Sequence, residues 1–471
     1  MKKLVIFLCA AVLVVGGIGA SAAYVHNPSR SFLQNTDEYD MVIIAPDVFS
    51  DIVQPLVDHK NAFGVNTFVK TTQDIFLEYE GRDTAEQVKY FIRDAIESFN
   101  ISYVLLFGGR QGQRFKWYVP CRYSNVDDGY MHKQFLSDLY FADVFKENGD
   151  FEDWDSNGNG VFAEWYEDAS LSSDVMDLIP DVAVGRLSCR NKREAAVVVD
   201  KIIGYETRAY GKNWFDKALL IGGDTNPGVG DPFDFEGEAD CNYTMQLLDG
   251  FNISTLYTSD GSLTHYSDFI DSFNTGFGFV VFHGHGLQDG LFTHDGDGEL
   301  IQIFDNEYIS ELNNEEMCPI MVVGCCLTTE FDVGLFNFLT LFKNLKQHHY
   351  VRNVKYECVS DVISWNLIKK PDGGIIAHVG SSSTAWGADG DEDLDGIPDS
   401  VQYGYTTGLC AEFFRVFDEG EIGVLGGVVS EAMTRVIEDN SACEDRVQCK
   451  CVQEFQLIGD PSLMIGGYPT S

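Results

Sequence analysis

Short runs of apolar residues alternate along this chain with longer segments in which apolar positions recur at helical spacing. Apolar runs of this length are typical of strands that are buried on both faces of a sheet, as parallel strands are. The apolar runs are 39–45, 103–107, 182–184, 217–223, 279–282, 320–323 and 373–379, and the helical segments are 85–99, 193–205, 412–417 and 428–437. This alternation predicts an α/β fold with a mostly parallel sheet flanked by helices.

The predicted elements form two series that meet near residues 211–214, where one helix ends before the next strand begins. A chain of 471 residues, 45% of them hydrophobic, is long enough for one large or two medium packed domains. We therefore expect two consecutive subdomains, an N-terminal one over 39–211 and a C-terminal one over 212–467.

The first residues have the pattern of a secretory signal peptide. Lys2 and Lys3 precede an apolar run from Leu4 to Val15, and small residues follow at 20–22. An uncleaved membrane anchor is the less favoured interpretation, because the run is shorter than the ~20 residues that a spanning helix needs. We expect a signal peptide over 1–22, a short N-terminal segment over 23–38, and a secreted protein without stable membrane insertion after cleavage.

The formal net charge of −41 argues against a nucleic-acid partner, because phosphate binding needs clustered Lys and Arg. For most of the acidic residues we favour the simple interpretation that they keep an extracellular surface soluble. Metal binding and attraction of cationic substrates are the alternative interpretation of the local acidic clusters.

The chain has 12 cysteines, of which Cys9 lies in the predicted signal peptide, so 12 − 1 = 11 remain in the mature chain. Secretion into an oxidising compartment makes disulfides plausible, and their pairing does not follow from the spacing. An odd number leaves at least one thiol unpaired, as a cysteine nucleophile requires.

Two chemically active groups follow neighbouring apolar runs. His283-Gly284-His285-Gly286 follows the run 279–282, and Cys325-Cys326 follows the run 320–323 after one glycine. In α/β sheets, functional groups gather beyond the carboxyl ends of the strands. The separation of 326 − 285 = 41 residues leaves room for a crossover helix between two adjacent parallel strands.

A thiol becomes a useful nucleophile when a nearby base stabilises its thiolate, and an imidazole can then protonate the leaving amine. Gly286 has no side chain, so its backbone amide can approach a scissile carbonyl and form an oxyanion hole with the amide of Cys326. The alternative is that these are buried loop residues without chemistry.

Further segments match a known family from about Tyr39 to Gly467. The segments are Tyr39-Asp40-Met41-Val42-Ile43-Ile44, Ser137-Asp138-Leu139-Tyr140-Phe141-Ala142-Asp143, Pro180-Asp181-Val182-Ala183-Val184-Gly185-Arg186, Gly284-His285-Gly286, Cys326 with Phe331, and Leu457-Ile458-Gly459-Asp460-Pro461-Ser462-Leu463. Together they resemble the gingipain-like cysteine peptidases, peptidase family C25. The resemblance implies a caspase-like fold and a secreted cysteine endopeptidase.

The resemblance also implies site residues. It favours His285 over His283 as acid and base, and Cys326 over Cys325 as nucleophile, because the family's cysteine precedes a phenylalanine by five residues, as Cys326 precedes Phe331. The segment 327–329 departs from the family, which carries Val-Asn-Gly there. Cys325 is then either a disulfide partner or a core residue.

Peptidases of this kind commonly cleave after basic residues and use an acid in the first specificity pocket. Asp177, nine residues before Arg186, is the candidate for that acid in this chain. A solvated loop aspartate is the alternative, and preference for basic residues is a hypothesis.

Residues 153–164 have the spacing of a calcium-binding loop, with Asp153, Asp155 and Asn157 at positions 1, 3 and 5, Gly158 at position 6 and Glu164 at position 12. A register that starts at Asp155 lacks the acid at position 12. The candidate ligands are Asp153, Asp155, Asn157, Asn159 and Glu164. An ordinary turn rich in Asp and Asn is the alternative.

A second acidic run, 389–399, is similar to the aspartate-rich calcium repeats of extracellular proteins. Its candidate ligands are Asp391, Asp393, Asp395 and Asp399, and a flexible acidic loop is the alternative. We expect calcium as the cofactor and protein or peptide substrates as the partners. Two other functions stay open: a calcium-dependent extracellular binding protein that has lost catalysis, and a transpeptidase or processing enzyme on the same fold.

Overall fold

The computed structural model describes residues 38–127, 134–166, 173–228, 233–337, 358–388, 390–403, 405–440 and 445–469. The predicted signal peptide lies outside these ranges, as do Asp389 and Cys443. In the described part of the chain, no helix combines the length and the apolar character that are needed to cross a bilayer.

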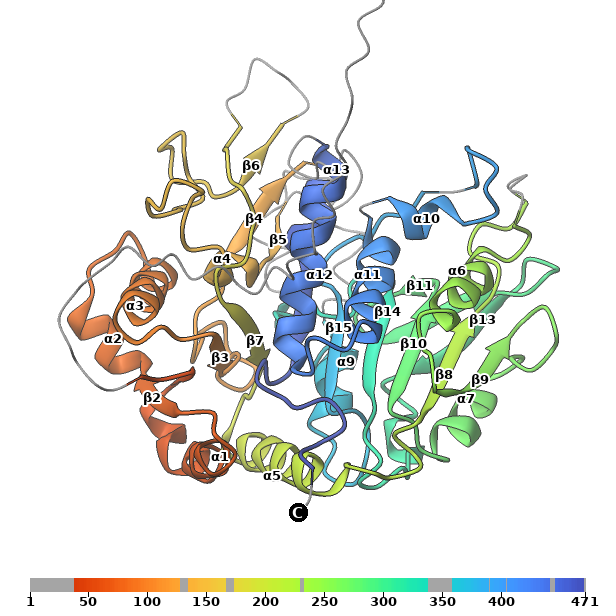
Figure 1. Ribbon diagram of the computed structural model, residues 1–471, viewed down its shortest axis with the longest axis horizontal. Coiled ribbons are helices and arrows are strands. Elements are labelled where there is room, and N and C mark those ends of the chain that lie inside the picture. The colour runs from red at the N-terminus through yellow and green to blue at the C-terminus, as the bar shows by residue number, and fades with distance from the viewer. Residues whose placement is uncertain are drawn as a thin grey trace, which may run out of the picture. The chain divides into compact units, whose positions relative to one another are not determined.

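A ten-stranded sheet forms the centre of the fold, in the spatial order β2-β1-β3-β7-β16-β15-β14-β10-β8-β9 (Figure 1). Its strands are β1 Met41–Ala45, β2 Thr67–Thr71, β3 Tyr103–Phe107, β7 Ala183–Leu187, β8 Lys217–Gly222, β9 Asn252–Tyr257, β10 Phe279–His283, β14 Ile320–Gly324, β15 Ala377–Ser381 and β16 Phe455–Ile458. The predicted apolar runs supply its central strands, and every residue of β1, β10 and β15 is buried. This burial explains why the runs contain so few polar residues.

Neighbouring strands pair in parallel everywhere in this sheet except between β15 and β16, which pair antiparallel. The sheet therefore consists of two parallel blocks that run in opposite directions. As a consequence, the amino end of β7 lies at the same edge as the carboxyl ends of β10 and β14. The prediction of a mostly parallel sheet is confirmed, and the reversal between the blocks was not predicted.

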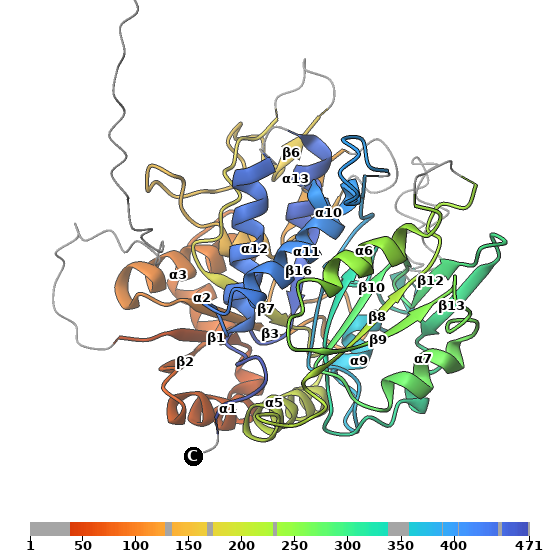
Figure 2. The ribbon, with the colours of Figure 1, turned by 45° about the vertical axis from the view of Figure 1, so that its right-hand side comes forward.

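Helices cover the sheet. They are α1 Ser50–Ala62, α2 Thr72–Glu78, α3 Thr84–Phe99, α4 Leu139–Ala142, α5 Lys192–Arg208, α6 Glu236–Met245, α7 Tyr266–Phe273, α9 Ile363–Ile368, α10 Asp399–Gln402, α11 Thr406–Asp418, α12 Leu425–Asn440 and α13 Arg446–Glu454. The side chain of Asp83 caps α3 and that of Asn191 caps α5, each by accepting backbone N–H groups of the first turn. In Figures 1 and 2, α6, α11 and α12 cross one face of the sheet, where they contact β8, β14 and β7 respectively.

The connection between β10 and β14 differs from the prediction. It contains no crossover helix but a small antiparallel sheet of β11 His285–Gly286, β12 Gly290–His294 and β13 Leu300–Asp305, followed by a short 3-10 turn at Ile309–Glu311. The acidic turn 295–299 closes the hairpin of β12 and β13, where the Asp295 carboxylate accepts the N–H groups of Asp297 and Glu299, both at 2.9 Å. This local turn chemistry favours a hairpin over a helix.

The run 373–379 was predicted as one strand, but β15 begins only at Ala377. Gly373 and Gly374 have φ values of 115° and 75°, which belong to a turn. The two predicted subdomains share the central sheet, because β16 from the C-terminal part lies next to β7 from the N-terminal part. A further small sheet consists of β4 Tyr123–Val126, β5 Phe135–Leu136 and β6 Glu164–Trp165.

Candidate active site

His285 and Cys326 leave the sheet side by side. The parallel strands β10 and β14 pair residue by residue up to His283 and Gly324. Each chain then continues for two residues, so the offset of 324 − 283 = 41 between the strands equals the offset of 326 − 285 = 41 between His285 and Cys326. Equal offsets along two adjacent parallel strands place both residues at the same level beyond the sheet.

Gly286 lets the two loops pack directly on each other. A Cβ atom at this position would overlap the carbonyl oxygen of Cys326 and lie only 2.8 Å from the Sγ of Cys325. Only glycine therefore fits between the histidine loop and the cysteine loop. The sequence suggested a different use for this glycine, as an amide near the substrate, and the two uses are compatible.

A segment that follows β15 holds the Cys326 loop. The backbone N–H of Ala385 donates to the Cys326 Sγ at 3.3 Å, and the N–H of Leu327 donates to the carbonyl of Ser383 at 2.9 Å. Cys326 is half-buried. The carbonyl oxygen of Ala385 also lies 3.7 Å from this sulfur, so the backbone of Ala385 contacts the Cys326 Sγ through both its donor and its acceptor.

His285 is held by a backbone carbonyl. Its Nε2 lies 2.7 Å from the oxygen of Thr225, and because a carbonyl can only accept, Nε2 carries the proton of the neutral ring. Nδ1 is then the basic nitrogen. Thr225 is fixed in turn by Glu236 at the start of α6, whose Oε2 accepts the Thr225 N–H at 2.9 Å and hydroxyl at 3.0 Å.

The residues next to the candidate pair have different environments. His283 is buried, neither ring nitrogen has a hydrogen-bond partner, and burial lowers its pKa to about 3. Burial raises the pKa of Cys325 well above its usual range, which keeps that thiol protonated. Both belong to the core, and these environments favour His285 and Cys326 for chemistry. Cys325 is a free thiol, so it is a core residue and not a disulfide partner.

Asp177 lies on the segment that leads to the amino end of β7. Its carboxylate accepts the N–H of Ile179 at 3.1 Å. Burial raises the pKa of Asp143 and, to about 6, the pKa of Asp181, and the charge of Asp177 adds to both rises, while Lys89 opposes them. Asp177 is thus one of a group of acids around Lys89, on the side of the sheet where the β10 and β14 loops also emerge.

The two predicted calcium loops have the same backbone. We call residues 153–164 the first acidic loop and residues 391–399 the second acidic loop. In the first, the Asp155 carboxylate accepts the N–H groups of Asn159 at 2.9 Å and Gly160 at 3.0 Å. In the second, the Asp391 carboxylate accepts those of Asp395 at 3.0 Å and Gly396 at 2.9 Å.

This match favours a register that starts at Asp155 for the first acidic loop. Its turn begins at Asp155, and Asp153 lies outside the turn, because the carboxylate that accepts the two closing N–H groups is that of Asp155. Asn157, Asn159 and Glu164 stay together, since both asparagine amides donate to one Glu164 oxygen. When positions are counted from Asp155, position 12 is not an acid, and the nearest carboxylate is that of Glu164 at position 10.

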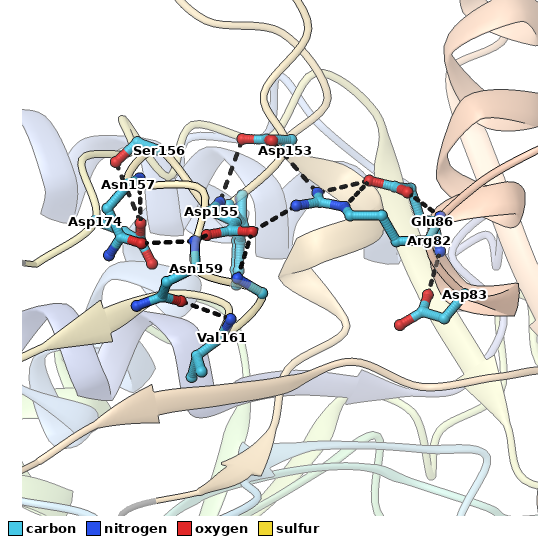
Figure 3. Close-up of polar contacts among 12 residues, drawn as sticks. Arg82, Asp83, Glu86, Asp153, Asp155, Ser156, Asn157, Asn159, Val161 and Asp174 are labelled. Atoms are coloured by element: carbon cyan, nitrogen blue, oxygen red, sulfur yellow. Dashed lines mark hydrogen bonds and ion pairs between the residues drawn. The ribbon is translucent and has the colours of Figure 1, made fainter.

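A guanidinium group neutralises the first acidic loop. Figure 3 shows Arg82 extending toward Asp153, Asp155 and Glu86. Its nitrogens lie 2.5 Å from Asp155 Oδ2, 3.3 Å from Asp153 Oδ2 and 2.6 Å from Glu86 Oε1. The oxygen atoms of this loop suit calcium, but Asp155 already has a cationic partner.

The second acidic loop fits a divalent cation better. Oxygen atoms of Asp391, Asp393 and Asp395 lie within 4.8 Å of one another, the one such cluster found among the described residues. Asp399 is 1% exposed, its Oδ2 accepts the N–H of Glu392 at 3.0 Å, and its Oδ1 has no hydrogen-bond partner. Several carboxylate oxygens around one turn form the ligand set that calcium prefers.

The partners Thr225, Glu236 and Ala385 were not identified from the sequence. Thr225 and Ala385 act through backbone atoms, which leave no signal in the residue type. Glu236 follows the apolar run 217–223 at the start of the next helix, and an acid at that position is common for reasons of helix stability alone.

Comparison with known proteins shows to which family this chain belongs. The model of peptidase family C25 matches residues 34–466. Gingipain R2 of Porphyromonas gingivalis (strain ATCC BAA-308 / W83) is 21% identical over 298 residues, which are 62% of this chain and 32% of that protein. Gingipain R1 of Porphyromonas gingivalis is also 21% identical over 298 residues, 24% of its length. The match thus spans a third or less of these relatives.

Two solved structures share the fold. One is the Arg-specific cysteine proteinase gingipain R (RgpB), with a TM-score of 0.62 and 18% identity over 93% of this chain and 80% of that chain. The other is the complex of the RgpB pro- and mature domains of Porphyromonas gingivalis, with a TM-score of 0.62 and 18% identity over 90% and 79%. The expectation of a caspase-like α/β fold is confirmed.

Proposed function

Because the chain belongs to peptidase family C25, we propose that it is a secreted cysteine endopeptidase with Cys326 as nucleophile and His285 as acid and base. The observation that carries this proposal is the packing of the His285 loop on the Cys326 loop through Gly286, at the ends of two adjacent parallel strands. Family membership implies protein or peptide substrates. Secretion is supported by the signal-like pattern of residues 1–22.

In the proposed reaction, the Cys326 Sγ attacks the scissile carbonyl carbon while its proton passes to Nδ1 of His285. The N–H groups of Gly286 and Cys326 stabilise the resulting oxyanion. The C–N bond breaks as His285 returns the proton to the leaving amine, which leaves a thioester on Cys326. Water then attacks the thioester, gives one proton to His285, and releases the carboxylic acid and the free thiol.

The hydrogen bond from His285 Nε2 to Thr225 supports both steps. It fixes the tautomer in which Nδ1 is free to accept a proton, and it stabilises the imidazolium that forms. A backbone carbonyl carries only a partial charge, so it orients the ring without forming an ion pair with it.

We also propose a preference for basic residues before the cleaved bond. A protein with the same fold is described as Arg-specific, and Asp177 is the candidate acid for binding the substrate's cation. Asp177 lies close enough to Asp143 and Asp181 for its charge to raise their pKa values, and the same charge would attract a cationic side chain of the substrate.

Calcium is the proposed cofactor. Asp391, Asp393, Asp395 and Asp399 would hold it in the second acidic loop, and its role would be to fix the loop. In the first acidic loop, Asp155, Asn157, Asn159 and Glu164 would hold it more weakly, because the positive charge of Arg82 opposes a second cation.

The test measures hydrolysis of reporter peptides with Arg, Lys, Asp or Asn before the cleaved bond, with calcium and with a chelator. We expect cleavage after Arg or Lys, loss of at least ~10³-fold in kcat/KM for Cys326→Ala, and little change in the neighbouring control Cys325→Ser. Asp177→Asn should selectively raise KM for basic peptides.

Retention of cleavage by Cys326→Ala would overturn the assignment of the nucleophile. Absence of cleavage by the wild type under every condition would favour a calcium-dependent binding protein that has lost catalysis. Transfer of the acyl group to an added amine in preference to water would favour a transpeptidase.

A further inference from the structure

A short segment that follows β15 lies against the candidate nucleophile and is held in turn by α13. It consists of residues 382–385, and we call it the Ala385 segment. At one end, the backbone N–H and carbonyl oxygen of Ala385 lie 3.3 Å and 3.7 Å from the Cys326 Sγ. At the other end, the N–H of Ser382 donates to the carbonyl of Glu454, the last residue of α13, at 2.9 Å. The segment therefore connects α13 directly to the sulfur.

A buried lysine on α13 makes a second contact with the Ala385 segment. The Nζ of Lys450 donates to the carbonyl oxygen of Thr384 at 2.5 Å and lies 3.1 Å from the carboxylate of Glu454, one helical turn later. The side chains of Lys450 and Glu454 are completely buried, and the ammonium lies 5.5 Å from the centre of the Phe135 ring. A charge in such surroundings is weakly screened, so it acts more strongly on its neighbours than a charge at the surface does.

The carbonyl of Thr384 and the N–H of Ala385 belong to one peptide group. The ammonium of Lys450 lies at the oxygen end of this group, and the Sγ of Cys326 lies at its hydrogen end. Because hydrogen bonds in a chain polarise one another, a cation at the oxygen makes the N–H a stronger donor. One peptide group thus transmits part of the charge of Lys450 to the sulfur.

The two contacts between Ala385 and the sulfur favour opposite protonation states. The carbonyl of Ala385 can accept only from the thiol, whereas the N–H stabilises the thiolate. A stronger N–H donor therefore shifts the balance toward the thiolate, which is the form that attacks. Lys450 strengthens the N–H alone, because the carbonyl of Ala385 belongs to the next peptide group.

Stability does not account for the buried ion pair. Burial of two charges costs free energy, and apolar residues of similar volume often replace a buried ion pair without loss of stability. The backbone bond of Ser382 already fixes the segment to α13, and it needs no charged side chain. The contact of Lys450 with the peptide group that reaches Cys326 gives the pair a further role.

We propose that Lys450 is a positioning residue for Cys326, which it activates through the Thr384–Ala385 peptide group. The ammonium polarises the peptide group, and the N–H of Ala385 then stabilises the thiolate. Glu454 offsets the cost of burying the ammonium. This inference rests on the proposed role of Cys326 and adds a residue that supports it from a distant helix.

The main test replaces the ion pair of the mature protein by apolar residues. Lys450→Met/Glu454→Leu should unfold near the urea concentration at which the wild type unfolds, because the removal of two buried charges offsets the lost bond to Thr384. Alkylation of Cys326 by iodoacetamide near neutral pH, followed by peptide mass spectrometry, should slow ~5-fold. The kcat of peptide cleavage should fall by a similar factor with little change in KM.

Alkylation at about pH 10 separates an effect of charge from a displaced sulfur. An ordinary thiol is ionised at this pH, so the rates of the wild type and the double variant should converge within ~2-fold. The other titratable groups near the sulfur or Lys450 are His285 on the neighbouring loop, Cys325 beside the sulfur, and Glu454 and Cys451 on α13. Burial raises the pKa values of Cys325 and Cys451 well above the usual range of a thiol, so both keep their protons. A rate that stays equally slow at both pH values would show a blocked sulfur and overturn the proposal.

Two single variants separate the charge of Lys450 from its hydrogen bond. Lys450→Gln supplies a donor without a charge, so Cys326 alkylation near neutral pH should slow as in the double variant. Lys450→Arg keeps the charge and should retain most of the rate of the wild type. The control Arg435→Met/Glu431→Leu removes a partly exposed ion pair of the same spacing from α12 and should behave as the wild type.

A folded double variant with the alkylation rate and the kcat of the wild type would overturn the role of Lys450 and leave the peptidase assignment intact. Equal rates in Lys450→Gln and Lys450→Arg would do the same, because only one of them carries the charge. Peptide cleavage by Cys326→Ala would instead overturn the assignment on which the inference rests.

Discussion

The first and the second acidic loops have the same backbone but different partners for their charges. Each places an aspartate at the start of a turn where it accepts two N–H groups, from Asn159 and Gly160 in one loop and from Asp395 and Gly396 in the other. Arg82 pairs with carboxylates of the first loop, whereas the second loop gathers the carboxylates of Asp391, Asp393 and Asp395 and, among the described residues, no arginine or lysine forms an ion pair with them. The local sequence sets the turn, and the surrounding fold decides which cation the turn is suited to bind.

The replacement of Arg82 tests the difference between the loops most strongly. Arg82→Met keeps the aliphatic chain and leaves Asp155, which is 3% exposed, without its ion pair. We expect the free energy of unfolding in chelator to fall by about 2 kcal/mol, less than the 3–5 kcal/mol of a fully buried pair because Arg82 is partly exposed. Urea denaturation measures this change.

Arg93→Met is the matched control, because Arg93 pairs with the exposed Asp94 and its loss should cost well under ~1 kcal/mol. Restoration of the Arg82→Met loss by calcium would show that metal and guanidinium compete for the first acidic loop. An unchanged stability of Arg82→Met in chelator would contradict the view that Arg82 neutralises this loop.

A pair of glycine substitutions tests the similarity between the loops. Gly160 and Gly396 both have a φ of 84°, and a Cβ atom at either position would meet no neighbouring atom. Backbone strain is therefore the main cost of an alanine, about 1 kcal/mol at each site. We expect Gly160→Ala and Gly396→Ala to lower the free energy of unfolding in chelator by equal amounts within ~0.5 kcal/mol. Clearly unequal costs would show that the two backbones differ.

The smallest effect is expected for Asp153→Asn. Asp153 lies outside the turn, and its ion pair with Arg82 spans 3.3 Å between partly exposed groups. The loss of stability should stay below ~0.5 kcal/mol, and calcium affinity measured by calorimetry should not change. Asp155→Asn is the comparison within the same loop. A strong loss of calcium affinity in Asp153→Asn would restore the register that starts at Asp153.

Much of the central sheet could be predicted because its strands are buried on both faces. The run 103–107 became β3 with the same bounds, and 320–323 became β14 with one more residue. The prediction failed where turn chemistry overrode the apolar pattern, as at Gly373, where a turn precedes β15. It also failed between β10 and β14, because the length of this connection did not distinguish a crossover helix from the hairpin of β12 and β13.

The sequence by itself determined the strand ends that carry His285 and Cys326, because an apolar run followed by glycine and a reactive side chain is a local pattern. Only the tertiary structure decided what holds these residues. Thr225 lies 60 residues from His285, Ala385 lies 59 residues from Cys326, and Arg82 lies 73 residues from Asp155. Every residue has a backbone carbonyl, and every residue except proline a backbone N–H, so only the folding of distant segments against one another selects the groups that reach the site.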